Sequence, residues 1–290
     1  MNLRLASVLV LLLLAQACGR VDELRLAHAN DGTAAAWPPG TPMIEMPLLP
    51  GDEGRAWVGV SVDGNPPVPF LLQNGAGAIA VTGARLPREL PEVIGRMTNV
   101  GSLLPGIAGG RLVQNRRLGI GPLEFLEQGL LIVDTSDWPH GRPGGGGAGV
   151  IGYDLFRRFP VEIDRDAGKA WLLKAGSVDV PLYQEVVRLA VLARRPYMEM
   201  ERVGERERGW VRLQLELGWP GGACLDRPGE GGRIVLPGGD LEIELEPCDA
   251  ARLPADPAAR RDGVLGFGAL DGRRLLVDYP GGRAILRANP

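Results

Sequence analysis

A short block of sequence occurs twice in this chain of 290 residues, once in the middle and once near the end. Gly-Val-Ile-Gly-Tyr at residues 149–153 matches Gly-Val-Leu-Gly-Phe at residues 263–267, an offset of 114 positions. Further identities at the same offset pair Asp164 with Asp278, Gly168 with Gly282, Ala170 with Ala284 and Leu172 with Leu286. Self-similarity at a fixed offset indicates two copies of one structural unit. The duplication therefore predicts two similar lobes that divide near Gly176.

Each copy also contains an apolar run that ends in a glycine turn. The first run is Phe-Leu-Leu-Gln-Asn-Gly at residues 70–75, and the second is Leu-Gln-Leu-Glu-Leu-Gly at residues 213–218. The first run lies farther ahead of its Gly-apolar-Gly block than the second run does. The first copy is therefore expected to contain extra loop material, including residues 138–148.

The pattern between these landmarks is typical of short strands. Residues 57–62 alternate apolar and small or polar side chains, and Asp63-Gly64 is a hairpin signal ahead of residues 68–72. The chain contains 43 glycines and 25 prolines, which interrupt it every few residues and favour an all-β body over a helical one. Short helices are expected only at residues 153–159 and 185–193, and the latter segment could equally be a strand.

The repeated order of turn and block resembles the bilobal aspartic proteases, especially the bacterial retropepsin-like ones. In that family each half carries an apolar pair followed by Asp-Thr/Ser-Gly. The resemblance covers nearly all of residues 44–290 and implies an all-β, two-lobed pepsin/retropepsin-like acid-protease fold, with lobes at residues 43–176 and 177–290. It also implies that two apolar-glycine blocks pack beneath the catalytic turns: Val150, Ile151 and Gly152, and Val264, Leu265 and Gly266.

The resemblance places the two catalytic acids at positions that here hold Gln73 and Glu216. Aspartic proteases depend on two carboxyl groups that share one proton, and glutamine cannot titrate. The remaining turn positions hold Asn74 and Gly75 in the first copy and Leu217 and Gly218 in the second. The sequence therefore predicts a catalytically inactive pseudoprotease that binds an extended peptide or protein segment in the cleft between its lobes.

Two other functions remain open. The chain could be an active aspartic endopeptidase with an atypical dyad, formed by Glu216 or by Asp134 together with Asp226. It could also be a purely structural envelope lipoprotein whose cleft is filled, which bulky packing of Trp219 between the lobes would favour.

The N-terminus is typical of an export signal. Arg4 precedes an apolar stretch at residues 5–17, which is shorter than the roughly 20 residues that span a bilayer. Its ending resembles a bacterial lipobox, which implies cleavage after residue 17, a lipid on Cys18 and a flexible tether at residues 18–42. The alternative is an ordinary cleaved signal that leaves a free thiol. Gly19 resembles the sorting signal for the outer membrane, so we expect a lipid-anchored envelope protein that faces the periplasm.

Export determines how the two remaining cysteines are interpreted. Cys224 and Cys248 lie 24 residues apart, and an oxidising compartment permits them to form a disulfide. The alternative is that both are small buried apolar residues that never meet.

Composition argues against several other classes. A net charge of −3 provides no basic surface for nucleic acid. His28 and His140 are the only histidines and both lie in loop-like sequence, so no metal site and no cofactor are expected. Residues 147–152 fit the letters of a dinucleotide-binding loop, but no strand is expected immediately before them, and the duplication explains the glycines better.

Overall fold

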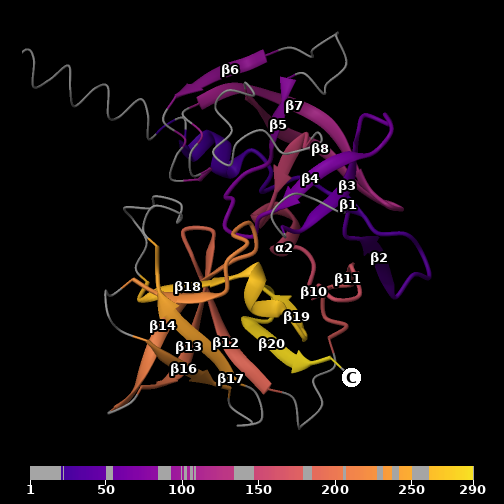
Figure 1. Cartoon of the computed structure of the whole chain (residues 1–290). Helices are drawn as coiled ribbons and strands as arrows, with labels where there is room; N and C mark the ends of the chain where they lie inside the picture. The colour runs from indigo at the N-terminus through magenta and orange to yellow at the C-terminus, as the bar shows by residue number, and fades with distance from the viewer. Residues whose placement is uncertain are drawn as a thin grey trace, which may run out of the picture.

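The computed structural model describes residue 21, residues 23–49, 55–83, 93–98, 100, 103–104, 107, 109–133, 147–178, 185–204, 207–226, 231–236, 242–249 and 261–289. Almost all regular structure in this part of the chain is β, and it is arranged in two lobes, one above the other in Figure 1. The prediction of a two-lobed all-β fold is confirmed.

The N-terminal lobe is built on an eight-stranded sheet. In the order in which they pair, its strands are β1 (Ala35–Ala36), β8 (Leu123–Val133), β5 (Ala80–Thr82), β9 (Gly149–Ile151), β4 (Val68–Leu72), β3 (Trp57–Val62), β7 (Gly109–Ile120) and β6 (Val93–Thr98). The short helix α2 (Tyr153–Phe156) follows β9. Strands β7 and β8 also pair with each other and form a long hairpin.

A twelve-stranded sheet forms the C-terminal lobe and the junction between the lobes. Its order is β14 (Arg208–Glu216), β18 (Gly263–Gly266), β15 (Ala223–Leu225), β17 (Glu242–Pro247), β16 (Gly232–Val235), β13 (Arg195–Val203), β12 (Glu185–Leu192), β20 (Arg283–Ala288), β19 (Arg273–Asp278), β10 (Val161–Asp164), β11 (Lys169–Leu173) and β2 (Met43–Pro47). The 3₁₀ helix η4 (Phe267–Leu270) follows β18.

The two lobes repeat one strand arrangement. The strand that ends at each turn pairs in parallel with the apolar-glycine strand of its own lobe, β4 with β9 and β14 with β18. The next strand, β5 or β15, then lies antiparallel to that apolar-glycine strand. The repeated sequence thus forms a repeated topology.

Strands β10 and β19 lie on the axis that relates the lobes. Val161 pairs with Val277 and Ile163 pairs with Leu275. Exchanging each residue for its counterpart 114 positions away converts one pair into the other, so the pairing is symmetric about its centre. The duplicated segments therefore do more than build separate lobes, because they also join the lobes through one continuous sheet.

The turns after β10 and β19 explain the repeated Asp and Gly positions. Asp164 accepts a hydrogen bond from the backbone N–H of Ala167, and Asp278 accepts one from Gly281, each at 2.9 Å. The glycines that follow have φ of +64° at Gly168 and +63° at Gly282, a conformation that side chains disfavour. Both repeats are explained by turn geometry without any catalytic role.

Residues 23–42, expected as part of a flexible tether, pack instead against the N-terminal lobe. Residues 23–28 are helical, and the side chains of Leu26 and Ala27 are buried in an apolar cluster with strands of that lobe. Asn30 is also buried and donates to Gly129 O and Asp154 Oδ2. The segment is short and mostly polar, so its sequence lacks a sustained apolar period that would have signalled this packing.

Other local predictions can be compared with the structure. The segment left open between helix and strand forms strand β12, and it pairs with both β13 and β20. Residues 138–146 of the expected loop lie outside the described residues. Within the described part of the chain, no helix is long and apolar enough to cross a membrane.

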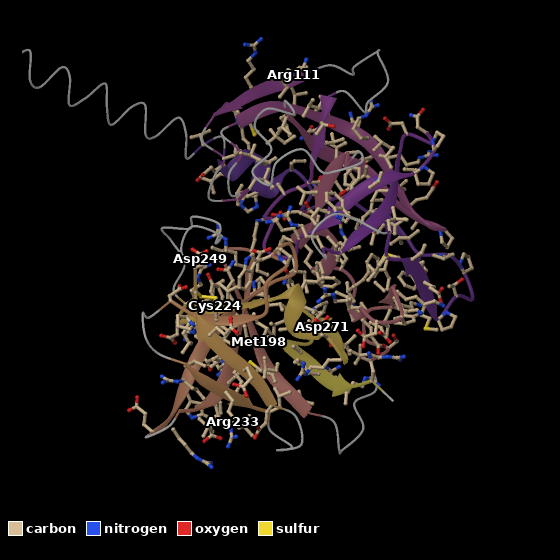
Figure 2. The ribbon with its side chains drawn as sticks, in the orientation of Figure 1. Arg111, Met198, Cys224, Arg233, Asp249 and Asp271 are labelled. Carbon is tan, nitrogen blue, oxygen red and sulfur yellow. A yellow bond between two sulfur atoms is a disulfide. The ribbon has the colours of Figure 1, made fainter. Side chains whose placement is uncertain are left out.

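Cys224 and Cys248 form a disulfide with a Cα–Cα distance of 4.9 Å. The bond ties β15 to the residue that follows β17, and Cys224 is labelled in the C-terminal lobe in Figure 2. In the chain-entropy treatment a loop of this length contributes about 3 kcal/mol to stability.

Candidate functional site

The two glycine turns meet where the lobes join. The first turn follows β4 and carries Gln73, and the second follows β14 and carries Glu216. The side chains of Gln73 and Glu216 both lie against Gly218 and are therefore neighbours. Both side chains are almost fully buried, at 5% and 3% relative exposure. The structure thus places together the two positions that correspond to the paired acids.

The glycine in each turn leaves room for a side chain at the centre of the site. A Cβ on Gly75 would lie 2.5 Å from Glu216 Oε2, and a Cβ on Gly218 would lie 2.8 Å from Gln73 Cγ. Contacts under 3.0 Å are not tolerated without movement of a neighbour. The retained glycines therefore let each turn approach the side chain of the opposite lobe.

The apolar-glycine blocks support the turns from beneath. Gln73 N donates to Ile151 O at 3.0 Å, and a Cβ on Gly152 would lie only 2.0 Å from Gln73 O. In the second lobe a Cβ on Gly266 would lie 2.4 Å from both Gly221 O and the Trp219 ring. Val150, Ile151, Val264 and Leu265 are buried. These blocks are therefore packing elements that fix the backbone of the site.

Asn74 connects the lobes through its side chain. Its amide Nδ2 donates to Leu215 O at 3.1 Å, and its Oδ1 accepts from Leu217 N at 2.8 Å. Asn74 is fully buried, so both backbone groups of the second lobe depend on it for partners. Leu217, at the equivalent position of the other turn, has no polar side-chain atom, so its side chain forms no matching hydrogen bond to the first lobe.

Tyr279 adds a second link between the lobes. Its hydroxyl donates to Asn74 O at 3.0 Å, and its ring packs 5.4 Å, centroid to centroid, from the ring of Phe156 in α2. Burial raises the pKa of the Tyr279 phenol well above its usual value, so the hydroxyl remains a neutral donor.

Burial governs the charge of Glu216. Loss of solvation raises the pKa of its carboxyl from 4.5 to about 7, opposed by the N–H of Gly218 and by the charges of Arg195 and Arg261. The backbone N of Gly218 donates a hydrogen bond to Glu216 Oε1 at 3.3 Å. The centre therefore contains one carboxyl that keeps its proton to a higher pH than usual, next to an amide that does not titrate.

A polar chain leads from this carboxyl toward the surface. Gln214 Nε2 donates to Glu216 Oε2 at 3.4 Å, and Arg261 Nη1 donates to Gln214 Oε1 at 2.8 Å. Arg261 also pairs with Asp226 at 3.0 Å. Sequence analysis did not identify Gln214 or Arg261. The alternation of β14 could have indicated Gln214, because residues two apart in a strand share a face.

Trp219 packs on its own lobe at the outer side of the second turn. Its ring covers Gly221 and Gly266, and it lines a hollow of about 390 Å³ with apolar Ala223 and Ile243. Glu244, Glu246 and Asp249 also line this hollow. Packing of Trp219 between the lobes would favour the filled-cleft alternative. The contacts of Trp219 described here all lie within its own lobe.

Residues between β6 and β7 lie beside the first turn. Gly77 N donates to Leu103 O at 2.6 Å, and the side chains of Leu103, Leu104 and Ile107 share an apolar cluster with Ala76. Leu103, Leu104 and Ile107 thus pack beside the first turn, a position that could not be deduced from the sequence.

Other proposed centres receive less support. Asp134 and Cys18 lie outside the described residues, and Asp226 is occupied by its ion pair with Arg261. Among the residues that the structure describes, no group of three or more His, Cys, Asp or Glu side chains could hold a metal ion.

No protein-family model matches the chain, and no curated protein sequence matches it. The fold is similar to the crystal structure of basic 7S globulin from soybean, with a TM-score of 0.55 and 12% identity over 85% of this chain and 95% of that one. It is similar also to conglutin gamma, a basic 7S globulin from lupine seeds, with a TM-score of 0.57 and 12% identity over 86% of this chain and 96% of that one.

These similarities correct the family suggested by the motifs. The assignment to the retropepsin-like proteases was wrong, because the two similar solved structures described above are basic 7S globulins. In this chain the glycine turns and apolar-glycine blocks are explained by how the two lobes pack on each other. The chain has the two-lobed β fold of the basic 7S globulins, with Gln73 and Glu216 at its centre.

Proposed function

We propose that this protein is an exported lipoprotein that binds an extended peptide or protein segment between its lobes and does not hydrolyse it. The observation that carries the proposal is that the buried side chains of Gln73 and Glu216 lie next to each other at the lobe junction. A paired-acid mechanism needs one carboxylate to activate water and a second, protonated carboxyl to polarise the substrate carbonyl. The amide of Gln73 does not titrate, so it can neither take a proton from water nor serve as the protonated carboxyl.

Several features favour binding over a purely structural role. Gln73 supplies both an amide donor and an acceptor, and Glu216 can donate or accept according to its protonation. An extended segment that lies along the junction would reach these groups after displacing the neighbours that bury them, and could then form main-chain hydrogen bonds, as in strand addition. The hollow beside Trp219 begins just beyond the second turn and has a volume within the usual range for ligand pockets. It could accept one side chain of the bound segment.

Two features support export and anchoring. Residues 5–17 are apolar and lead directly to Cys18, the residue that would carry the lipid. The disulfide between Cys224 and Cys248 is the kind of bond that persists in oxidising compartments. We therefore propose the bacterial envelope as the location, with a lipid on Cys18 as the membrane contact.

Replacing Trp219 with alanine is expected to weaken capture of denatured casein by about tenfold, since a buried aromatic anchor contributes strongly to binding. Capture is measured on casein-coupled resin, with recovery of intact casein on elution. Trp210→Ala is the matched control, because Trp210 lies on β14 and is 75% exposed. Equal capture by the wild type and the Trp219 variant, or release of cleaved casein, would contradict the proposal.

One observation favours a second function. The pKa of about 7 at Glu216 is suited to a general acid or base at neutral pH. A hydrolase that relied on Glu216 alone would lose its activity in Glu216→Gln, whereas a binding protein would keep its ligand.

A further inference from the structure

A hollow of about 420 Å³ lies between the helical residues 23–28 and the edge strand β6. Arg25 and His28 line it from the helix, and Ile94 and Arg96 line it from β6. Met97 and Leu112, which are buried, are also in its lining. The hollow therefore combines an apolar floor with a rim that carries positive charge.

The helical segment presents an apolar face to solvent beside this hollow. Val21 and Leu24 are 47% and 58% exposed, whereas Leu26 and Ala27 are buried against the lobe. Residues four apart lie on one face of a helix, so Val21 precedes Arg25 by one turn and Leu24 precedes His28 by one turn. The outer face thus alternates apolar side chains with an arginine and a histidine.

Strand β6 extends this surface. Val93 and Ile94 of this strand are exposed. Together with Val21 and Leu24 they make up four of the eight large apolar side chains that are exposed in the described residues. Arg96 and Arg25 have no ion-pair or hydrogen-bond partner among the described residues. His28 is paired with Asp31, so the permanent positive charge comes from the two arginines.

The place of this surface in the chain indicates what covers it. Val21 comes three residues after Cys18, the proposed site of the lipid. Any membrane that holds a lipid on Cys18 must lie within a few residues' reach of the helical segment. Apolar side chains interspersed with arginines match the boundary between acyl chains and anionic headgroups.

We propose that Val21, Leu24, Arg25, His28, Ile94 and Arg96 form a docking surface for the anionic phospholipid headgroups of the membrane. This inference rests on the proposed lipid anchor and adds a second contact to it. A cationic apolar surface next to the lipid holds the protein in one orientation on the membrane. The lobe junction is then presented at a fixed height above the bilayer.

The test measures hydrogen exchange of the full chain with vesicles of phosphatidylcholine, with and without phosphatidylglycerol. Amides of residues 23–28 and 93–98 are expected to exchange more slowly only with phosphatidylglycerol. Arg25→Gln with Arg96→Gln is expected to reduce the preference for anionic vesicles about 30-fold, roughly fivefold for each arginine. Leu24→Asp is expected to weaken vesicle binding about tenfold.

Matched controls come from the opposite lobe. Leu192→Asp and Arg233→Gln change exposed residues of β12 and β16, and Figure 2 labels Arg233 at the far end from Arg111 of β7. These variants are expected to bind like the wild type. Equal exchange in neutral and anionic vesicles would overturn the proposal. Protection of the same amides at high protein concentration without vesicles would also overturn it, because it would indicate that a second copy of the chain covers this surface.

The mass of the purified chain separates this inference from the proposed anchor. A chain without lipid on Cys18 would refute the anchor, and flotation of that chain with vesicles would still report the docking surface. Flotation that depends on phosphatidylglycerol and on Arg25 and Arg96 would support docking. Flotation that depends neither on phosphatidylglycerol nor on the two arginines would reject docking, whether or not Cys18 carries a lipid.

Discussion

Asn74→Ala is expected to lower the free energy of unfolding by about 4 kcal/mol. The substitution removes the partners of Leu215 O and Leu217 N, both of which lie in the buried second turn. Each buried backbone group left without a partner costs about 1–3 kcal/mol. Because the two groups belong to the opposite lobe, the loss falls on the contact between the lobes. Urea unfolding at neutral pH measures it.

Asn65→Ala provides the matched control. Asn65 also donates its side-chain amide to a backbone carbonyl, that of Val62 at 2.9 Å, but it lies in an exposed turn where water can replace it. We expect the control to change stability by less than about 1 kcal/mol. Similar losses in the two variants would show that Asn74 does not carry the lobe contact.

Glu216→Gln is expected to remove a fall in stability between pH 4.5 and 7. The native pKa of about 7 exceeds the unfolded value of 4.5, so the native state retains a proton that the unfolded state has released. The stabilising effect of the raised pKa is complete below pH 4.5 and is lost as the pH rises through 7. The difference between these two values corresponds to about 3 kcal/mol.

The comparison of wild type with Glu216→Gln isolates this effect. Burial also raises the pKa of Asp154, which gives the wild type and the variant the same additional slope in the same direction. At pH 8 the variant is expected to be more stable than the wild type, because it buries no charge. Glu199→Gln, which changes a partly exposed partner of Arg212, should leave the slope unchanged. Parallel profiles for wild type and Glu216→Gln would exclude a buried titrating Glu216.

The sequence was most informative where one short motif recurred at a fixed offset. The offset of 114 predicted two lobes, and the turns placed Gln73 and Glu216 at equivalent positions. Local chemistry was sufficient for these features, because glycine turns and alternating strands depend on neighbouring residues.

Features that depend on distant contacts were not predicted. The side chain of Asn74 bridges to residues more than 140 positions away, and β2 joins the far edge of the twelve-stranded sheet instead of its own lobe. Neither contact leaves a periodic signal. The family was also misassigned, since the motifs encode the packing of two lobes and do not distinguish among proteins with that fold.

A peptidase assay distinguishes a lobe junction that only binds a polypeptide from one that cleaves it. Denatured casein is incubated with wild type and with Glu216→Gln from acidic to neutral pH, with and without pepstatin, and fragments are identified by mass spectrometry. We expect the wild type to release no more fragments than the variant at any pH. Pepstatin-sensitive cleavage by the wild type that is lost in Glu216→Gln would contradict it.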